Sequence, residues 1–164
     1  MDDPGAAASA VATLLVERRQ TLAVSESSAG GLISAAFLAL PGASAFFVGG
    51  AVVYTEAARE ALLGITPAGM GGSRSASEPY ALLAARTVRE RLGTVWGLAE
   101  TGAAGPTGNL YADAAGHVCL AVSGPVELVR TVETGSDDRA ANMHAFAAAA
   151  LALLDEALAG ASAR

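Results

Sequence analysis

The hydrophobic positions of the chain follow two alternating periodicities. Segments with leucine, valine and alanine at helical spacing alternate with short runs of apolar and β-branched residues. The helical spacing predicts helices over residues 6–19, 32–40, 56–63, 78–92 and 137–158. The short apolar runs predict strands over residues 21–25, 45–54, 94–100, 117–123 and 126–133. This alternation, with a late hairpin between the last two strands, predicts a three-layer α/β/α sandwich around a mixed sheet of about five strands.

The ends of the predicted helices carry residues with known capping preferences. Thr55 and Ser77 precede two of the helices and are expected to cap them, and Gly64 and Gly93 follow the same two helices. The glycine-serine segment 69–75 is predicted to be a flexible loop and is a candidate lid. With no repeat or linker in the chain, a single domain over residues 1–164 is expected.

Composition narrows the classes of partner. The net charge of −6 argues against nucleic acid, which requires clustered cations, and no uninterrupted apolar run is long enough to predict a membrane span. Asp2 and Asp3 replace the basic start of a signal sequence, so a cytoplasmic protein is expected. Cys119 is predicted to be a buried core thiol, and the two histidines and one cysteine show no metal-ligand spacing. No metal and no cofactor is expected.

The absence of lysine restricts the possible chemistry more than the net charge or the cysteine content does. All ten basic residues are arginines, and the sequence contains no lysine. A mechanism that requires a lysine amine is therefore excluded.

Two glycine-bearing segments follow predicted strands and are the candidate ligand loops. Ligands of open α/β sheets bind beyond the carboxyl ends of the strands. The first segment, 26–31, places Ser27 at a strand-to-helix turn where backbone amides could support an oxyanion or a phosphate, so Ser27 is the candidate nucleophile. The alternative is that Ser27 or Ser28 only caps the following helix. The second segment, 101–108, is either a ligand loop or an ordinary connection.

Taken together, the motifs resemble the CinA C-terminal family of competence/damage-inducible proteins over nearly the whole chain. Residues 26–31 are similar to the family's Glu-Ser-Cys-Thr-Gly-Gly, and residues 49–59 to its glycine-rich strand, Tyr-Ser and lysine-bearing helix. Residues 77–78, 101–106 and 116–118 are similar to its Val-Ser-Glu, Thr-Gly-Ile-Ala-Gly-Pro and Gly-Thr-Val. Several segments in order at consistent spacing make the resemblance specific.

The resemblance implies an amidohydrolase that converts nicotinamide mononucleotide to nicotinate mononucleotide and ammonia. It assigns the nucleophile to Ser27 and a supporting role to Tyr54, and it places the family's catalytic lysine at Arg59. A guanidinium stays protonated at ordinary pH, so Arg59 could bind an anion but could not accept the serine proton. The substrate-binding residues that the resemblance implies are Glu26, Ser28, Gly30, Gly31, Thr101, Gly102, Ala104 and Gly105.

Other departures from the family's pattern accompany Arg59. Residues 113–115 and Met143 replace basic or apolar residues of that pattern, and Ala29 replaces its threonine. Glu100, expected at the end of a strand beside the second loop, is the best substitute base, ahead of Glu26 and His117. The alternative for Glu100 is an exposed carboxylate or an ion pair with Arg59.

The two histidines have a simpler interpretation. Neither His117 nor His144 has a partner visible in the sequence, so both are expected to be structural or exposed to solvent.

Three functions therefore stay open. The first is a divergent amidohydrolase acting on a pyridine nucleotide. The second is a non-catalytic member that binds a nucleotide or a protein. The third is a homo-oligomer that buries the apolar segment 45–53 and the terminal helix against a second copy.

Overall fold

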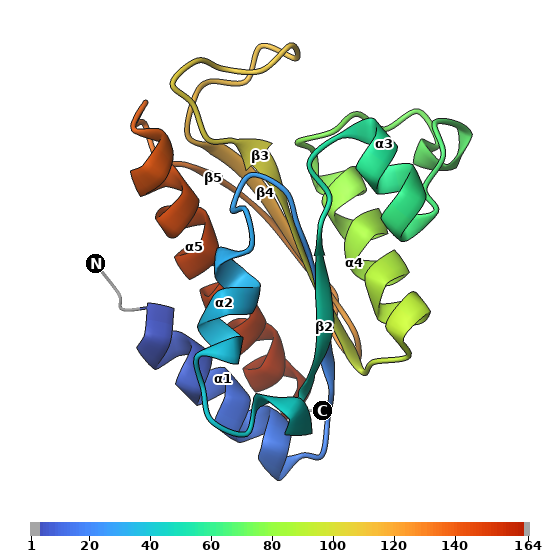
Figure 1. The fold of residues 1–164 in the computed structure, drawn as a ribbon, viewed down its shortest axis with the longest axis vertical. Coiled ribbons are helices and arrows are strands. Elements are labelled where there is room, and N and C mark those ends of the chain that lie inside the picture. Colours follow the sequence, from blue (N-terminus) through green and yellow to red (C-terminus); the bar gives the residue numbers. More distant parts are fainter. Residues whose placement is uncertain (1–3, 163–164) are drawn as a thin grey trace.

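The computed structural model describes residues 4–162, which form a five-stranded sheet between two layers of helices (Figure 1). The strand order is β2-β1-β3-β4-β5, in which β1 is parallel to β2 and β3, and β4 is antiparallel to β3 and β5. The predicted three-layer sandwich with a mixed sheet is confirmed. The strands are β1 Leu22–Glu26, β2 Phe47–Val52, β3 Trp96–Ala103, β4 His117–Ser123 and β5 Leu128–Glu133.

One face of the sheet is covered by α1 Pro4–Glu17, α2 Leu32–Leu38 and α5 Arg139–Ser162 (Figure 1). The larger apolar side chains lie here, among them Phe37, Trp96 and Phe146, all of which are fully buried. This layer contains the larger of the two hydrophobic clusters, and burial of apolar surface is the main favourable contribution to folding.

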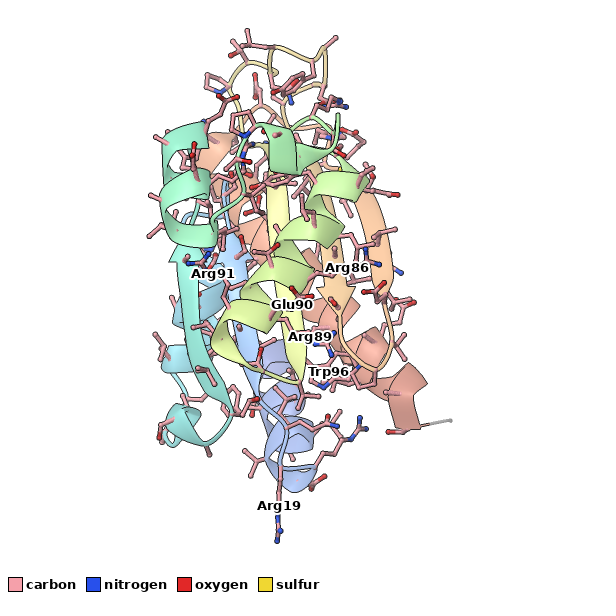
Figure 2. The ribbon with its side chains drawn as sticks, turned by 90° about the vertical axis from the view of Figure 1, so that its right-hand side faces the viewer. Arg19, Arg86, Arg89, Glu90, Arg91 and Trp96 are labelled. Carbon is pink, nitrogen blue, oxygen red and sulfur yellow. The ribbon has the colours of Figure 1, made fainter. Side chains whose placement is uncertain are left out.

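The other face is covered by α3 Glu56–Ala58, the π-helical turn Arg59–Leu63 and α4 Glu78–Leu92. Small residues allow α4 to approach the sheet closely, since a Cβ added at Gly97 would lie 2.1 Å from the carbonyl oxygen of Ala85. Figure 2 views this face and labels Arg86, Arg89, Glu90 and Arg91 in the last turns of α4. The Arg91 guanidinium donates to the carbonyl oxygen of Leu63 at 3.0 Å, so α4 holds the end of the π-helical turn.

Most predicted bounds differ from the observed ones by a few residues, and three of the differences bear on the site. β3 extends to Ala103 because β4 pairs with it as far as the Ala103–His117 position, so Glu100, Thr101 and Gly102 lie within a strand. The predicted helix 56–63 is a single α turn followed by a π turn. β2 is shorter than the predicted strand 45–54 and is an edge strand with alternating exposure. Thr55 and Ser77 cap α3 and α4 as predicted, by accepting from Ala58 N and Tyr80 N.

The terminal helix α5 is long and apolar enough to cross a membrane by length and composition alone. It contributes Phe146, Leu151 and Leu154 to the core between α1 and the sheet, and 44% of its most apolar window is buried. Its apolar composition is therefore explained by packing inside the α/β/α sandwich.

Candidate functional site

Glu26, the last residue of β1, fixes the first candidate loop to the start of α2. Its side chain is fully buried, and one carboxylate oxygen accepts from the backbone N–H groups of Gly31 and Ile33 at 3.1 and 2.9 Å. The other oxygen accepts from the N–H and the hydroxyl of Ser34 at 2.9 and 2.7 Å. A carboxylate at a helix N-terminus satisfies amides that the helix itself cannot pair. The helix cap is thus Glu26, and the alternative that Ser27 or Ser28 caps α2 is wrong.

Glu100 holds the same loop from the neighbouring strand. It is 2% exposed, and one carboxylate oxygen accepts from Ser27 N at 2.8 Å and Ala29 N at 2.9 Å. Its other oxygen accepts from the Ser28 hydroxyl. Burial raises the pKa of Glu100, while the three hydrogen bonds from the turn oppose the rise and the charge of Glu26 adds to it.

This geometry contradicts the alternative interpretation of Glu100 as an exposed or Arg59-paired carboxylate, and it gives no support to the prediction of a substitute base. The side chain is neither exposed nor within ion-pair distance of Arg59. It does not line the pocket described below, and both of its oxygens are engaged by the loop. Glu100 is therefore a positioning residue for the Ser27 turn, and its prediction as a substitute base has no geometric support.

A pocket of about 530 Å³ opens beyond the carboxyl ends of β1 and β3, a volume suited to a small ligand. Five of the predicted site residues line it: Ser27, Tyr54, Arg59, Thr101 and Gly102. The other predicted site residues do not line it, and these are Glu26, Ser28, Gly30, Gly31, Glu100, Ala104 and Gly105. The nucleophile candidate and the residue at the lysine position thus share one pocket.

Arg59 is a buried cation on the wall of this pocket. The side chain is 5% exposed, and its Nη1 donates to the Ser75 hydroxyl at 3.1 Å. The guanidinium carbon lies 5.4 Å from the ring centroid of Tyr80, a cation–π contact. Within residues 4–162, its Nε has no hydrogen-bond partner and no carboxylate reaches ion-pair distance. A buried charge without a counter-charge is unfavourable.

Tyr54, on the wall of the pocket, is hydrogen-bonded by Arg139, a residue that the sequence reasoning missed. Arg139 Nη2 donates to the Tyr54 hydroxyl at 3.1 Å, and its Nη1 donates to the carbonyl oxygen of Gly105 at 2.5 Å. Arg139 is the first residue of α5, where a cation opposes the helix dipole. That unfavourable placement at a predicted helix start was the signal that could have drawn attention to it.

The loop between β3 and β4 extends beyond the sheet (Figure 1) and is fixed by polar contacts. Asp113 binds Arg74 through two hydrogen bonds of 2.6 and 3.0 Å, which lower the pKa of the Asp113 carboxyl although its burial opposes this. The Arg74 guanidinium carbon lies 5.0 Å from the ring centroid of Tyr111, which lines the pocket. This cluster holds the loop against Arg74, which lies in the predicted lid 69–75.

His117 is structural and has more partners than its sequence context indicated. It is 6% exposed, its Nδ1 contacts Glu133, and its Nε2 lies 3.0 Å from the carbonyl oxygen of Ala76. Burial opposes the charged ring, but these contacts and nearby Asp113 outweigh it and raise the pKa of His117. Because it does not line the pocket, it is poorly placed to replace the missing base.

The two remaining predictions concern the cysteine and metal ligands. Cys119 is a free thiol that is 2% exposed, so the prediction of a buried core thiol is confirmed. No group of three or more potential metal ligands occurs within the described part of the chain.

Comparison with known proteins agrees with the motifs. The sequence profile of the CinA C-terminal domain matches residues 5–158. The chain belongs to the CinA family. It is 44% identical over 131 residues to a CinA-like protein of Gloeobacter violaceus, covering 80% of this chain and 30% of that protein. It is 42% identical over 155 residues to a CinA-like protein of Syntrophus aciditrophicus, covering 94% of this chain and 37% of the relative.

Solved structures of the CinA family share the fold. A competence or damage-inducible protein from Enterobacter asburiae is 28% identical with a TM-score of 0.89, over 96% of this chain and 99% of the other. A competence/damage-inducible protein from Agrobacterium tumefaciens is 28% identical with a TM-score of 0.88, over 96% of each chain. This CinA-family chain spans about a third of the length of the curated relatives it matches.

Proposed function

We propose that this CinA-family chain binds a pyridine nucleotide in the Ser27 pocket and that hydrolysis of the nucleotide's amide is suppressed there. The observation that carries the proposal is the shared pocket of Ser27 and Arg59, in which a buried guanidinium lines the same wall space as the candidate nucleophile where the family has a lysine. The pocket volume and the mixture of tyrosine, hydroxyl and cationic groups on its walls support a small polar ligand with an aromatic ring.

Suppression of hydrolysis follows from the proton that Ser27 would have to lose. As the bond from Ser27 Oγ to the amide carbon forms, a base must accept the hydroxyl proton, and ammonia leaves when the carbon–nitrogen bond breaks. Arg59 cannot accept the proton, and the carboxylates of Glu26 and Glu100 are occupied by the loop. None of Arg59, Glu26 and Glu100 is therefore available to accept the proton of Ser27.

The backbone of the turn gives a second reason. An oxyanion needs free N–H donors, yet the N–H groups of Ser27 and Ala29 donate to Glu100. The N–H of Gly30 donates to Ser27 O at 3.1 Å, and that of Gly31 donates to Glu26. Four amides of the turn are thus committed within the chain and would have to break these bonds to stabilise a tetrahedral intermediate.

Calorimetric titration with nicotinamide mononucleotide, combined with an ammonia assay, tests the proposal. We expect saturable 1:1 binding and ammonia release by the wild type no faster than by Ser27→Ala. Failure to bind this nucleotide and its acid counterpart would overturn the binding function. Ammonia release that depends on Ser27 would overturn the suppression of hydrolysis.

A second candidate function, retained hydrolysis, is favoured by one observation. Glu56 is an exposed carboxylate on the wall of the same pocket, one helical turn before Arg59. An exposed carboxylate is free to accept a proton directly or through a water molecule. Hydrolysis that is present in the wild type and lost in both Ser27→Ala and Glu56→Gln would establish this candidate. Hydrolysis that Ser27→Ala removes and Glu56→Gln keeps would reject Glu56 as its base, and no hydrolysis by the wild type would reject the candidate.

A further inference from the structure

The guanidinium of Arg59 is the feature of the pocket that the proposed function leaves unexplained. Arg59 carries a fixed positive charge and is only 5% exposed. Within residues 4–162, no carboxylate lies within ion-pair distance of it. Elsewhere in the chain, arginines near acids form ion pairs, as Arg74 does with Asp113 and Arg86 with Glu127. The counter-charge for Arg59 is therefore expected from outside the described chain.

The contacts of Arg59 restrict where that counter-charge would lie. Nη1 of Arg59 donates to Ser75, and the ring of Tyr80 lies against part of the guanidinium. Arg59 itself also lines the pocket. Tyr80 and Ser75 line the same pocket, so the guanidinium is held in one orientation at its wall. An anion entering the pocket gains a rigid, weakly hydrated and already desolvated partner.

We infer that Arg59 makes this pocket selective for a ligand carboxylate over the corresponding carboxamide, so that the site retains the acid rather than the amide. A guanidinium offers planar, parallel N–H donors that match a carboxylate, whereas the amino group of a carboxamide would direct hydrogens at a cation. The inference rests on the proposed pyridine-nucleotide pocket and deepens it by naming the ligand class. The residue that prevents proton removal from Ser27 is thus also the residue that recognises the deamidated form.

The two mononucleotides named by the family's reaction are a matched pair for testing this. Nicotinate and nicotinamide mononucleotide share the ring, ribose and phosphate, and they differ only at the carboxylate or carboxamide. We expect the wild type to bind the acid at least about 30-fold more tightly, the lower end of the loss caused by leaving one member of a buried charge pair unpaired. In Arg59→Gln, which can hydrogen-bond but carries no charge, this ratio is expected to fall close to one.

Arg74→Gln is the matched control, because it also removes one positive charge near the pocket but from an arginine already paired with Asp113. It can weaken both ligands by loosening the loop, yet it should leave the ratio of their dissociation constants unchanged. Arg59→Met serves as a second variant without the charge if Arg59→Gln does not fold, and thermal unfolding of each variant establishes that it is folded.

The outcomes separate the two proposals. If the wild type binds neither mononucleotide, the proposed pocket function falls and this inference falls with it. If the wild type binds both with equal affinity, the pocket function stands and the carboxylate preference is overturned. Equal weakening of both ligands in Arg59→Gln, with a wild-type ratio near one, would instead assign Arg59 to the phosphate and would also overturn the inference. A large wild-type ratio that Arg59→Gln removes and Arg74→Gln keeps supports it.

Discussion

Exchanging each of the two buried glutamates for glutamine should have sharply different effects on stability. Both Glu26 and Glu100 are fully or almost fully buried, and both bind backbone amides of the Ser27 turn or the start of α2. Glutamine has nearly the same shape but replaces one accepting oxygen with a donating amino group. The effect on stability therefore depends on whether the groups that donate to the replaced oxygen can instead accept a hydrogen bond from the new amino group.

The partners differ in this respect. At Glu26, each oxygen accepts from at least one backbone N–H, so glutamine must direct its amino group at an N–H that cannot accept. We expect Glu26→Gln to lower the free energy of unfolding by about 2–4 kcal/mol, the cost of a lost charge-assisted bond and a buried unpaired donor. At Glu100, one oxygen accepts only from the Ser28 hydroxyl, which can turn and accept instead. Glu100→Gln should therefore change the free energy of unfolding by less than about 1 kcal/mol.

Urea unfolding followed by circular dichroism at pH 7 measures both variants against the wild type. We predict that their free energies of unfolding differ by about 2 kcal/mol or more, with Glu26→Gln the less stable. The gap should narrow in acid. The raised pKa of Glu100 means that its ionised form opposes folding, so wild-type stability falls as pH rises through that pKa while Glu100→Gln lacks this fall. Equal losses, or a larger loss in Glu100→Gln, would refute the assignment of the hydrogen bonds.

Three further outcomes follow from the packing and the buried charges. Gly97→Ala should lower the free energy of unfolding by about 2 kcal/mol or more in the same urea titration, because the added Cβ meets a carbonyl oxygen of α4 at 2.1 Å. The control Gly49→Ala should lower it by less than about 1 kcal/mol, because its Cβ would lie 3.5 Å from the nearest atom. His117→Gln should destabilise the protein more at pH 6 than at pH 9. Burial opposes the charged ring, but contact with Glu133 outweighs burial and raises the pKa of His117, so the charged ring stabilises the fold until the pH rises through that pKa. Equal losses of stability at both pH values would contradict this. Arg59→Met should raise the unfolding free energy of the ligand-free protein by about 1 kcal/mol, because it removes an unpaired buried charge, and a loss of stability would show that the charge is compensated.

The sequence predicted the layers of the fold because its hydrophobic periodicities are regular. Strand and helix segments were found in order, and Thr55 and Ser77 cap the helices that they precede. The end of β3 was placed too early because Glu100 is charged and a hydropathy pattern treats charge as a boundary. Only long-range pairing with β4 and the donors of a loop 71 to 73 residues away explain why that carboxylate is buried within a strand.

The candidate site was predicted less completely. Ser27, Tyr54, Arg59 and Thr101 were identified as a group, and they line one pocket. The burial of Arg59 was not foreseeable, since a regular helix was expected where a π turn occurs, and a π turn changes which residues face inward. Arg139 was missed because its two partners lie 85 and 34 residues away.

The rate of ammonia release from nicotinamide mononucleotide by Arg59→Lys tests most directly whether an arginine in place of lysine at position 59 keeps Ser27 from losing its proton. Lysine restores a side chain whose pKa can be lowered by burial to a value at which it accepts a proton. We predict that the wild type releases ammonia at the rate of Ser27→Ala and that Arg59→Lys exceeds both. Ser27-dependent ammonia release by the wild type, with no gain in Arg59→Lys, would contradict the account.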